Sequence, residues 1–290
     1  MFQSNKDRLL TALVVGMAAI AGSIVVIIGV FVVKESIPAM THIGGRRFLT
    51  DESWHPADDA SRGQFNLLPI LLGTVLSSMG AICVAAPLGV LSAVFCQFYA
   101  PVRVARWYRM MIELMAGVPS VVFGLWGLVV LVPIVASIHP PGQSLVTGII
   151  ILTLMILPTV VLLTDAAFSS VSHSYRQGAA ALGLSRATTV LSVMIPAAWS
   201  GIVTAVLLGL VRALGETMAV VMVCGNVVRL PKGLFDPIRT LTGTIALEMG
   251  YARGDHRASL FFCGMVLLIL VAVLVASIEI VNRRGRHDTT

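Results

Sequence analysis

The sequence predicts an all-α, polytopic membrane protein with six transmembrane helices, on the evidence of its composition and its apolar segments. The 290 residues are 57% hydrophobic and only 12% charged, whereas soluble domains carry about 25% charged residues. Six stretches are mostly apolar and close to the ~20 residues that a helix needs to cross a bilayer. The net charge of +6 then reflects basic loops beside the spans, and a soluble enzyme or nucleic-acid-binding domain is excluded.

The first two apolar stretches are long. Residues 9–33 carry no charge and exceed the roughly 7–15 apolar residues of a cleaved signal peptide, so we expect an uncleaved membrane anchor. Residues 67–99 are rich in Gly, Ala and Ser, and Pro87 lies among them. Because proline removes a backbone donor, we expect Pro87 to break this helix.

The third stretch, about residues 111–138, contains Glu113 near its start and Pro119 among several glycines. Pro119 either breaks the helix beside a transport path or makes a kink that neighbouring helices satisfy. The last three stretches are residues 146–163, 197–223 and about 260–281.

Basic residues in the short connections predict the orientation. Positive residues collect on the cytoplasmic side, so we expect these connections and both termini to lie in the cytoplasm. The residues are Lys6, Arg8, Arg103, Arg106, Arg109, Arg176, Arg186, Arg283, Arg284 and Arg286. The long loops at roughly 34–66 and 224–259 fall on the outer side. They are candidates for docking a partner, with passive connectors as the alternative.

Arg212 and Glu216 lie four residues apart in the fifth apolar stretch, which predicts that they share one face of a helix. A charge at the centre of a membrane costs about 2.5–3.5 kcal/mol on insertion scales, so it usually faces a bundle interior or a water-filled path. The five donors of arginine suit an oxyanion. We favour a substrate path over a purely structural ion pair, because a structural pair has no need of a place inside the membrane.

Small residues recur every four positions on the same stretch, which allows close helix approach. They could pack against a partner or within this chain. These residues are Gly201, Ala205, Gly209 and Ala213.

The connection before the fifth stretch predicts a helix–turn–helix at the cytoplasmic surface. Residues 179–182 are good helix formers, and Gly183 permits a turn. Ser185 can cap a second helix, and Pro196 suits the start of the next span. On physical grounds it is either a docking element or a plain interfacial helix.

This connection resembles the EAA motif of ABC importer permeases. Gln177-Gly178-Ala179 stands in the E-A-A place, Gly183 has the expected spacing, and 193–196 match the closing I-x-L-P in type. Gln replaces the consensus Glu, and Gly replaces the first Ala. In that family the loop is a coupling helix that enters a cleft on the ATP-binding subunit. The resemblance thus implies coupling roles for Gln177, Gly178, Ala179, Gly183, Ser185 and Arg186.

Three further stretches resemble the PstC-type phosphate permeases within this family: residues 117–133, 195–202, and the run Arg212-Ala-Leu-Gly-Glu-Thr-Met-Ala-Val220. The resemblance covers about residues 66–282 and implies the type I ABC importer permease fold. It divides the chain into a helix and outer loop (1–65), a transmembrane domain (66–282, coupling loop about 170–196) and a cytoplasmic tail (283–290). It places Arg212, Glu216 and Thr217 on the path of inorganic phosphate.

The resemblance also implies partners: a PstA-type second permease, a PstB-type ATPase dimer and a PstS-type outer phosphate-binding protein. No Gly-Lys dipeptide occurs, so there is no Walker A loop, and we expect ATP and Mg on the ATPase chains. The four cysteines form no CxxC pair, which predicts buried thiols and no metal site. The alternatives are a permease for another oxyanion, such as phosphonate or sulfate, and a secondary transporter or channel.

Overall fold

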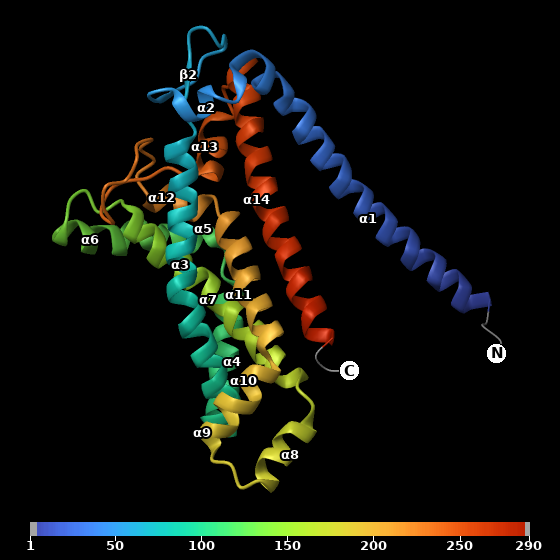
Figure 1. The fold of residues 1–290 in the computed structure, drawn as a ribbon. Helices are drawn as coiled ribbons and strands as arrows, with labels where there is room; N and C mark the ends of the chain where they lie inside the picture. The colour runs from blue at the N-terminus through green and yellow to red at the C-terminus, as the bar shows by residue number, and fades with distance from the viewer. Residues whose placement is uncertain (1–4, 288–290) are drawn as a thin grey trace. The chain divides into compact units, whose positions relative to one another are not determined.

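The structure, a computed structural model, describes residues 5–287 and divides into two compact units (Figure 1). The hairpin unit comprises residues 5–66 and 248–268, and the bundle unit comprises 67–247 and 269–287. Helix dominates both, and the one pair of strands among the described residues has two residues per strand. The all-α prediction is therefore confirmed. The last three residues of the predicted tail lie outside the described residues.

The hairpin unit begins with a long apolar helix that continues into a π-helical turn and a small folded loop. Strands β1 and β2 are antiparallel, with Trp54 opposite Phe65. The elements are α1 (Asn5–Pro38), η1 (Ala39–Gly44), α2 (Arg47–Thr50), β1 (Trp54–His55), β2 (Gln64–Phe65) and the first part of α14 (Gly254–His287).

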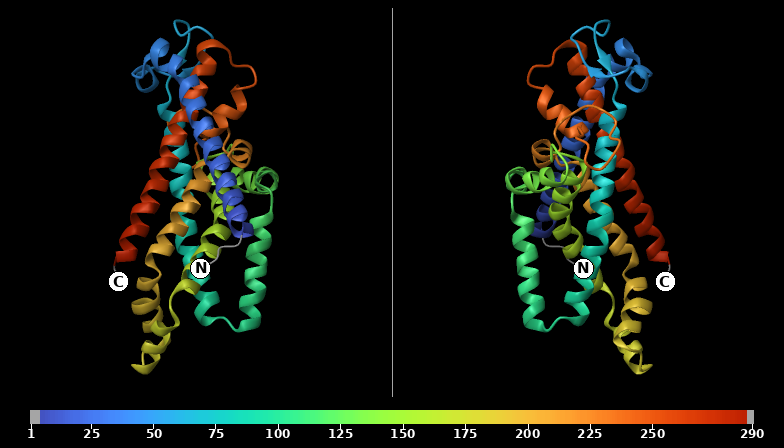
Figure 2. Two further views of the ribbon diagram at one scale, coloured as in Figure 1. Left: turned by 90° about the vertical axis from the view of Figure 1, so that its right-hand side faces the viewer. Right: turned by 90° about the vertical axis from the view of Figure 1, so that its left-hand side faces the viewer.

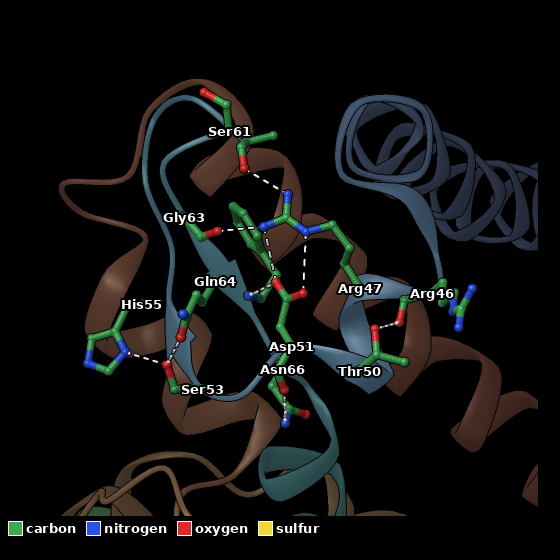
Figure 3. Close-up of polar contacts among 12 residues, drawn as sticks. Arg46, Arg47, Thr50, Asp51, Ser53, His55, Ser61, Gly63, Gln64 and Asn66 are labelled. Carbon is green, nitrogen blue, oxygen red and sulfur yellow. Dashed lines mark hydrogen bonds and ion pairs between the residues drawn. The ribbon is translucent and has the colours of Figure 1, made fainter.

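Arg47 holds the first long loop (about residues 34–66) together (Figure 3). Its guanidinium donates to the carbonyl oxygens of Ala60 and Gly63 at 2.7 and 2.6 Å and forms an ion pair with Asp51 at 3.2 Å. The Asp51 carboxylate in turn accepts a hydrogen bond from the backbone N–H of Phe65 at 2.9 Å. The loop is therefore an ordered structure built around one charged pair.

A buried polar cluster lies in the same unit. Glu248 and His256 are both buried, and His256 Nε2 is 2.9 Å from Glu248 Oε2. Trp54 Nε1 donates to the same carboxylate at 3.1 Å. Buried charged groups are tolerated when they are paired and hydrogen-bonded, and this cluster meets that condition. Sequence reasoning missed it because Trp54 lies 194 positions from Glu248, and because Glu248 and His256, eight positions apart, lie on two different helices.

The bundle unit is organised around α7, which packs against α3, α4 and α11. Its elements are α3 (Leu68–Val94), η2 (Phe95–Tyr99), α4 (Val102–Gly117), α5 (Ser120–Trp126), η3 (Gly127–Leu131), α6 (Val132–Ile138), α7 (Leu145–Ser170), α8 (His173–Ala181), α9 (Arg186–Thr189), η4 (Val190–Met194), α10 (Ile195–Ala197), α11 (Trp199–Leu214) and α12 (Met218–Val223). A further helix, α13 (Leu241–Glu248), leads to the hairpin unit.

The row of small residues on α11 packs within this chain. A Cβ atom added to Gly201 would lie 2.5 Å from the Cβ of Ala167 on α7, and one on Gly209 would lie 2.9 Å from Val160 on the same helix. Ala205 is fully buried. Of the two alternatives, the structure therefore shows packing of α11 on α7.

Among the described residues, five helices are long and apolar enough to cross a membrane, with a sixth if one bent pair counts as a span, against six predicted spans. The bent pair is Arg186–Ala197 with Trp199–Leu214, at an angle of 70°. Several boundaries differ from prediction: α1 and α14 extend past both predicted ends, α7 runs on to Ser170, and the fifth span ends at Leu214.

The expected break at Pro87 was wrong, whereas the break at Pro119 occurs. Helix α3 runs through Pro87 without interruption, because losing one backbone donor is a small loss in a helix that packs along α7. At Pro119, α4 ends at Gly117 and α5 starts at Ser120, so the third stretch is two helices. Val118 is extended (φ −70°, ψ 128°), the conformation that a following proline favours.

The prediction of buried thiols holds for three cysteines. Cys96, Cys224 and Cys263 are buried, whereas Cys83 on α3 is exposed on the isolated chain. Cys83 was therefore predicted wrongly, because an apolar segment does not reveal which of its faces is covered.

Candidate functional site

Arg212 lies in the last turn of α11 and is exposed on the isolated chain. Its Nη1 donates to the Thr159 hydroxyl on α7 at 3.0 Å. Among the contacts of the described residues, this is the guanidinium's one side-chain hydrogen bond. Because α11 is otherwise apolar, a charged group on its outer face needs water, a ligand or another chain as its surroundings.

Glu216 does not share a helical face with Arg212, which corrects the sequence prediction. Helix α11 ends at Leu214, and Glu216 lies in the break before α12. Its Oε1 accepts a hydrogen bond from the backbone N–H of Ala219 at 3.2 Å. The physical reason is that the first N–H groups of a helix lack partners within it, and the carboxylate satisfies one at the start of α12.

No ion pair joins Arg212 to Glu216 in the part of the chain that the structure describes. The carbonyl oxygen of Glu216 accepts a hydrogen bond from the Thr242 hydroxyl at 2.7 Å. Thr217 is the residue that precedes α12, and its hydroxyl donates weakly to the carbonyl of Gly215 at 3.3 Å. The structure thus brings the three predicted path residues to one interruption between α11 and α12.

The interrupted segment packs against a second one. A Cβ atom added to Gly124 on α5 would lie 2.8 Å from Ala219 Cα and 2.9 Å from Met222 Sδ on α12. Both helices begin directly after a break, α5 after Pro119 and α12 after Thr217. Two of the sequence stretches that carry the family resemblance therefore meet in space.

The connection between α7 and α11 folds as the sequence predicts. Gly183 has φ +67°, which favours glycine. The backbone N–H of Leu184 donates to Ala179 O at 3.1 Å, and that of Gly183 donates to Ala180 O at 3.0 Å. These two bonds form a Schellman motif that ends α8. Ser185 Oγ then accepts from the N–H of Thr188 at 3.1 Å and caps α9.

This connection, here called the coupling loop (residues 171–198), presents a small apolar groove and an exposed tip. Gln177, Gly178, Gly183 and Arg186 are exposed, whereas Ala179 is buried. Leu182 at the tip is 79% exposed. The groove has a volume of about 300 Å³ and is lined by Ser174, Tyr175, Gly178, Ala179, Leu182, Leu184 and Val193. Leu182 is thus both an exposed apolar side chain and part of the wall of the groove.

Aromatic contacts anchor the coupling loop to the bundle. The guanidinium of Arg176 lies 5.0 Å from the ring centroid of Phe98 on η2. Phe98 in turn packs edge-to-face on Phe168 of α7 at 5.3 Å. Met194 and Ile202 belong to the same buried apolar cluster as Phe168. The loop therefore packs directly against α7 and α11.

Sequence reasoning missed one charged network close to this end of the bundle. Arg109 on α4 donates through Nη2 to Asp165 on α7 and to Gln97 on η2, both at 2.9 Å. From the sequence, Arg109 indicated only the orientation of the chain, and Asp165 lay beyond the predicted end of its span. An acidic residue next to a long apolar run was the available signal.

The second long loop (about residues 224–259) is shaped by Asp236. Its carboxylate accepts hydrogen bonds from the backbone N–H groups of Lys232 and Gly233 at 2.6 and 3.1 Å, and Arg229 pairs with it at 3.3 Å. The hydrogen bond from the backbone N–H of Lys232 is the main reason why the pKa of Asp236 lies below its ordinary value. The carboxylate is therefore ionised at neutral pH and keeps the turn closed.

Residues 85–287 match the model of the family described as "Binding-protein-dependent transport system inner membrane component". The chain belongs to this family. It is a multi-pass membrane component of an ABC transport system, in which ATP hydrolysis takes place on a separate subunit.

Curated relatives carry more specific names. The chain is 36% identical over 282 residues to the "Probable ABC transporter permease protein YqgH" of Bacillus subtilis, covering 96% of this chain and 90% of the relative. It is 36% identical over 254 residues to the "Phosphate transport system permease protein PstC" of Mesorhizobium japonicum (80% and 76%). It is 32% identical over 283 residues to "PstC 1" of Mycobacterium tuberculosis (88% and 82%).

Solved structures support the fold. The inward-facing MetNI methionine ABC transporter aligns with a TM-score of 0.57 at 20% identity, covering 76% of this chain and 94% of that chain. An amino acid ABC transporter crystallised with histidines aligns with a TM-score of 0.55 at 16% identity (75% and 93%). At these identities the likeness shows the importer permease fold alone.

Proposed function

We propose that this chain is the permease subunit of an ATP-driven importer that carries inorganic phosphate across the cytoplasmic membrane. The observation that carries the proposal is the match to PstC-named relatives over 80% or more of the chain. Those alignments are long enough to take in the coupling loop and the α11–α12 break together. No observation favours phosphonate or sulfate instead.

The α11–α12 break supplies the chemistry that a phosphate path needs. Arg212 is exposed, and Thr159 accepts from Nη1 alone, so other guanidinium donors stay available. An arginine guanidinium can donate two parallel hydrogen bonds to two oxygens of one phosphate, a geometric specificity that lysine lacks. Glu216 is engaged at the start of α12 rather than on Arg212. We assign contact with passing phosphate to Arg212, and the shaping of the break to Glu216 and Thr217.

The coupling loop is assigned to the ATPase subunits. Exposed Gln177, Gly178 and Arg186 and the protruding Leu182 fit a cleft on another protein, and the loop's attachment to α7 and α11 links that cleft to the path. Gln177 carries no charge, so an ion pair with the ATPase at this position is not part of the proposal. ATP and Mg belong to the partner chains.

The proposed assembly follows from family membership. It contains a related PstA-type permease, a dimer of PstB-type ATPases and a PstS-type phosphate-binding protein on the outer side. The basic short connections place the coupling loop and both termini in the cytoplasm. The second long loop, closed by Asp236, then lies on the side of the binding protein.

A substrate test on the purified complex separates phosphate from its rivals. ATP hydrolysis is measured with the candidate binding protein and either phosphate, sulfate or a phosphonate. We expect phosphate alone to stimulate hydrolysis. Stimulation by sulfate or a phosphonate without a response to phosphate would overturn the assignment.

A further inference from the structure

A groove that the proposed function does not use opens where η2 meets α4. It has a volume of about 540 Å³, and its charged lining residues are Arg106, Arg109 and Glu113. Cys96 and Ala105, which also line it, are buried. Figure 2 shows α3 and α4 as two arms joined by the turn before α4, at the same end of the bundle unit as the coupling loop.

Arg109 has donor capacity that the chain does not use. Its Nη2 serves Asp165 and Gln97, and no hydrogen bond among the described residues uses its Nη1. The Arg109 side chain is 37% exposed, so an acceptor from outside the chain can reach the guanidinium. Arg106, exposed and three residues earlier on α4, lies on the same helical side and adds a second cation.

The charge of Glu113 determines which kind of ligand fits the groove. Glu113 is exposed and lies one turn beyond Arg109, and side chains at this spacing have Cβ atoms about 5–6 Å apart. The carboxylate would repel a simple anion such as inorganic phosphate. A group that carries a phosphate and an ammonium a few ångströms apart would match both signs of charge. The headgroup of phosphatidylethanolamine has this arrangement.

The surface of α4 also suits a lipid. Val102, Trp107 and Leu114 are 74%, 64% and 60% exposed. Helix α4 is not among the candidate membrane spans of the described residues, so this surface fits the membrane–water interface, where tryptophan is enriched and apolar side chains reach the ends of acyl chains. The groove therefore combines a polar pocket with an adjoining apolar surface.

We propose that this groove binds an ammonium-bearing phospholipid. Its phosphate lies on Arg106 and Arg109, its ammonium on Glu113, and its acyl chains along the exposed side of α4. The proposed orientation of the chain assigns this lipid to the cytoplasmic leaflet, but the binding chemistry does not depend on that orientation.

Lipid binding to the assembled transporter tests the proposal. The complex is delipidated in detergent and titrated with phosphatidylethanolamine or phosphatidylglycerol, and bound lipid is counted by native mass spectrometry. The variants are Arg106→Gln and Glu113→Gln, and the matched control is Arg103→Gln, which is exposed on the same helix but does not line the groove. Competition with inorganic phosphate distinguishes a lipid site from a free-anion site.

We expect Arg106→Gln to weaken binding of both lipids about tenfold, since one charge-assisted contact is lost. Glu113→Gln should remove a roughly threefold preference for phosphatidylethanolamine, the size of one exposed ion pair, and Arg103→Gln should match the unmodified complex. The proposal is overturned if the two groove variants bind lipid as the control does. It is also overturned if inorganic phosphate displaces the lipid, or if a partner subunit fills the groove in a structure of the complex. Transport is not measured, so failure here leaves the proposed function standing.

Discussion

At the scale of single residues, the proposed phosphate path depends most on Arg212. Its guanidinium contacts Thr159 and not Glu216, so the two charges do not form a self-sufficient pair. Arg212→Gln should lower phosphate uptake at least tenfold while the complex still assembles, because a charged hydrogen bond is worth about 1.5–3 kcal/mol. Arg212→Lys should retain part of the uptake, since it keeps the charge but not the fork.

The double variant Arg212→Gln with Glu216→Gln separates a path from a scaffold. A purely structural pair would regain function once both charges are gone. Since the structure shows no such pair, we expect no recovery in the same uptake assay. Uptake by the double variant near the unmodified rate would refute the role of Arg212 in the path.

Removal of the Asp165 carboxylate should lower the stability of the bundle unit. It is 17% exposed and Arg109 is 37% exposed, so the pair is partly screened, and Asp165→Asn should cost roughly 1–2 kcal/mol. The readout is thermal unfolding of the purified complex followed by intrinsic fluorescence. Arg103→Gln is the comparison, because Arg103 is also near this end of the bundle but has no side-chain partner in the described part of the chain. Equal melting temperatures for the two variants would show that the network does not stabilise the bundle.

At the scale of elements, the coupling loop depends on the backbone of Gly183. Its φ of +67° disfavours any side chain, so Gly183→Ala should strain the Schellman turn by about 1–2 kcal/mol. Gly22→Ala is the matched variant: it adds the same methyl group to α1 at a position with open space around it and improves helix propensity. We expect Gly183→Ala to reduce binding of the ATPase subunits in pull-downs and Gly22→Ala to preserve it. Equal binding by both would argue against a defined turn.

Local chemistry explains which elements could be predicted from the sequence. The turn at Gly183 and the cap by Ser185 depend on neighbouring residues, and both occur in the structure. The interruption after Leu214 was missed, because the apolar run continues through it and periodicity does not show where a carboxylate will cap a new helix. The pairing of Arg109 with Asp165 was missed because the two residues lie on different helices, 56 positions apart. At Pro87 the sequence predicted a break that the structure does not have, since packing on α7 outweighs the loss of one backbone hydrogen bond.

At the scale of the whole molecule, the orientation of the chain can be tested directly. The basic short connections predict that the C-terminus lies in the cytoplasm. A reporter that fluoresces only in the cytoplasm should be bright when fused after Thr290. A dark fusion, combined with activity of a periplasmic reporter at the same point, would reverse the orientation and with it the side on which the coupling loop lies.

The central claim is that this permease, assembled with its partners, moves phosphate inward at the expense of ATP. The direct measurement is uptake of radiolabelled phosphate into proteoliposomes that contain the whole complex, with the binding protein supplied on the outer face and ATP inside. The account predicts ATP-dependent phosphate accumulation that excess unlabelled sulfate does not reduce and that Arg212→Gln abolishes. Phosphate uptake without ATP, or ATP-driven accumulation of labelled sulfate in place of phosphate, would contradict it.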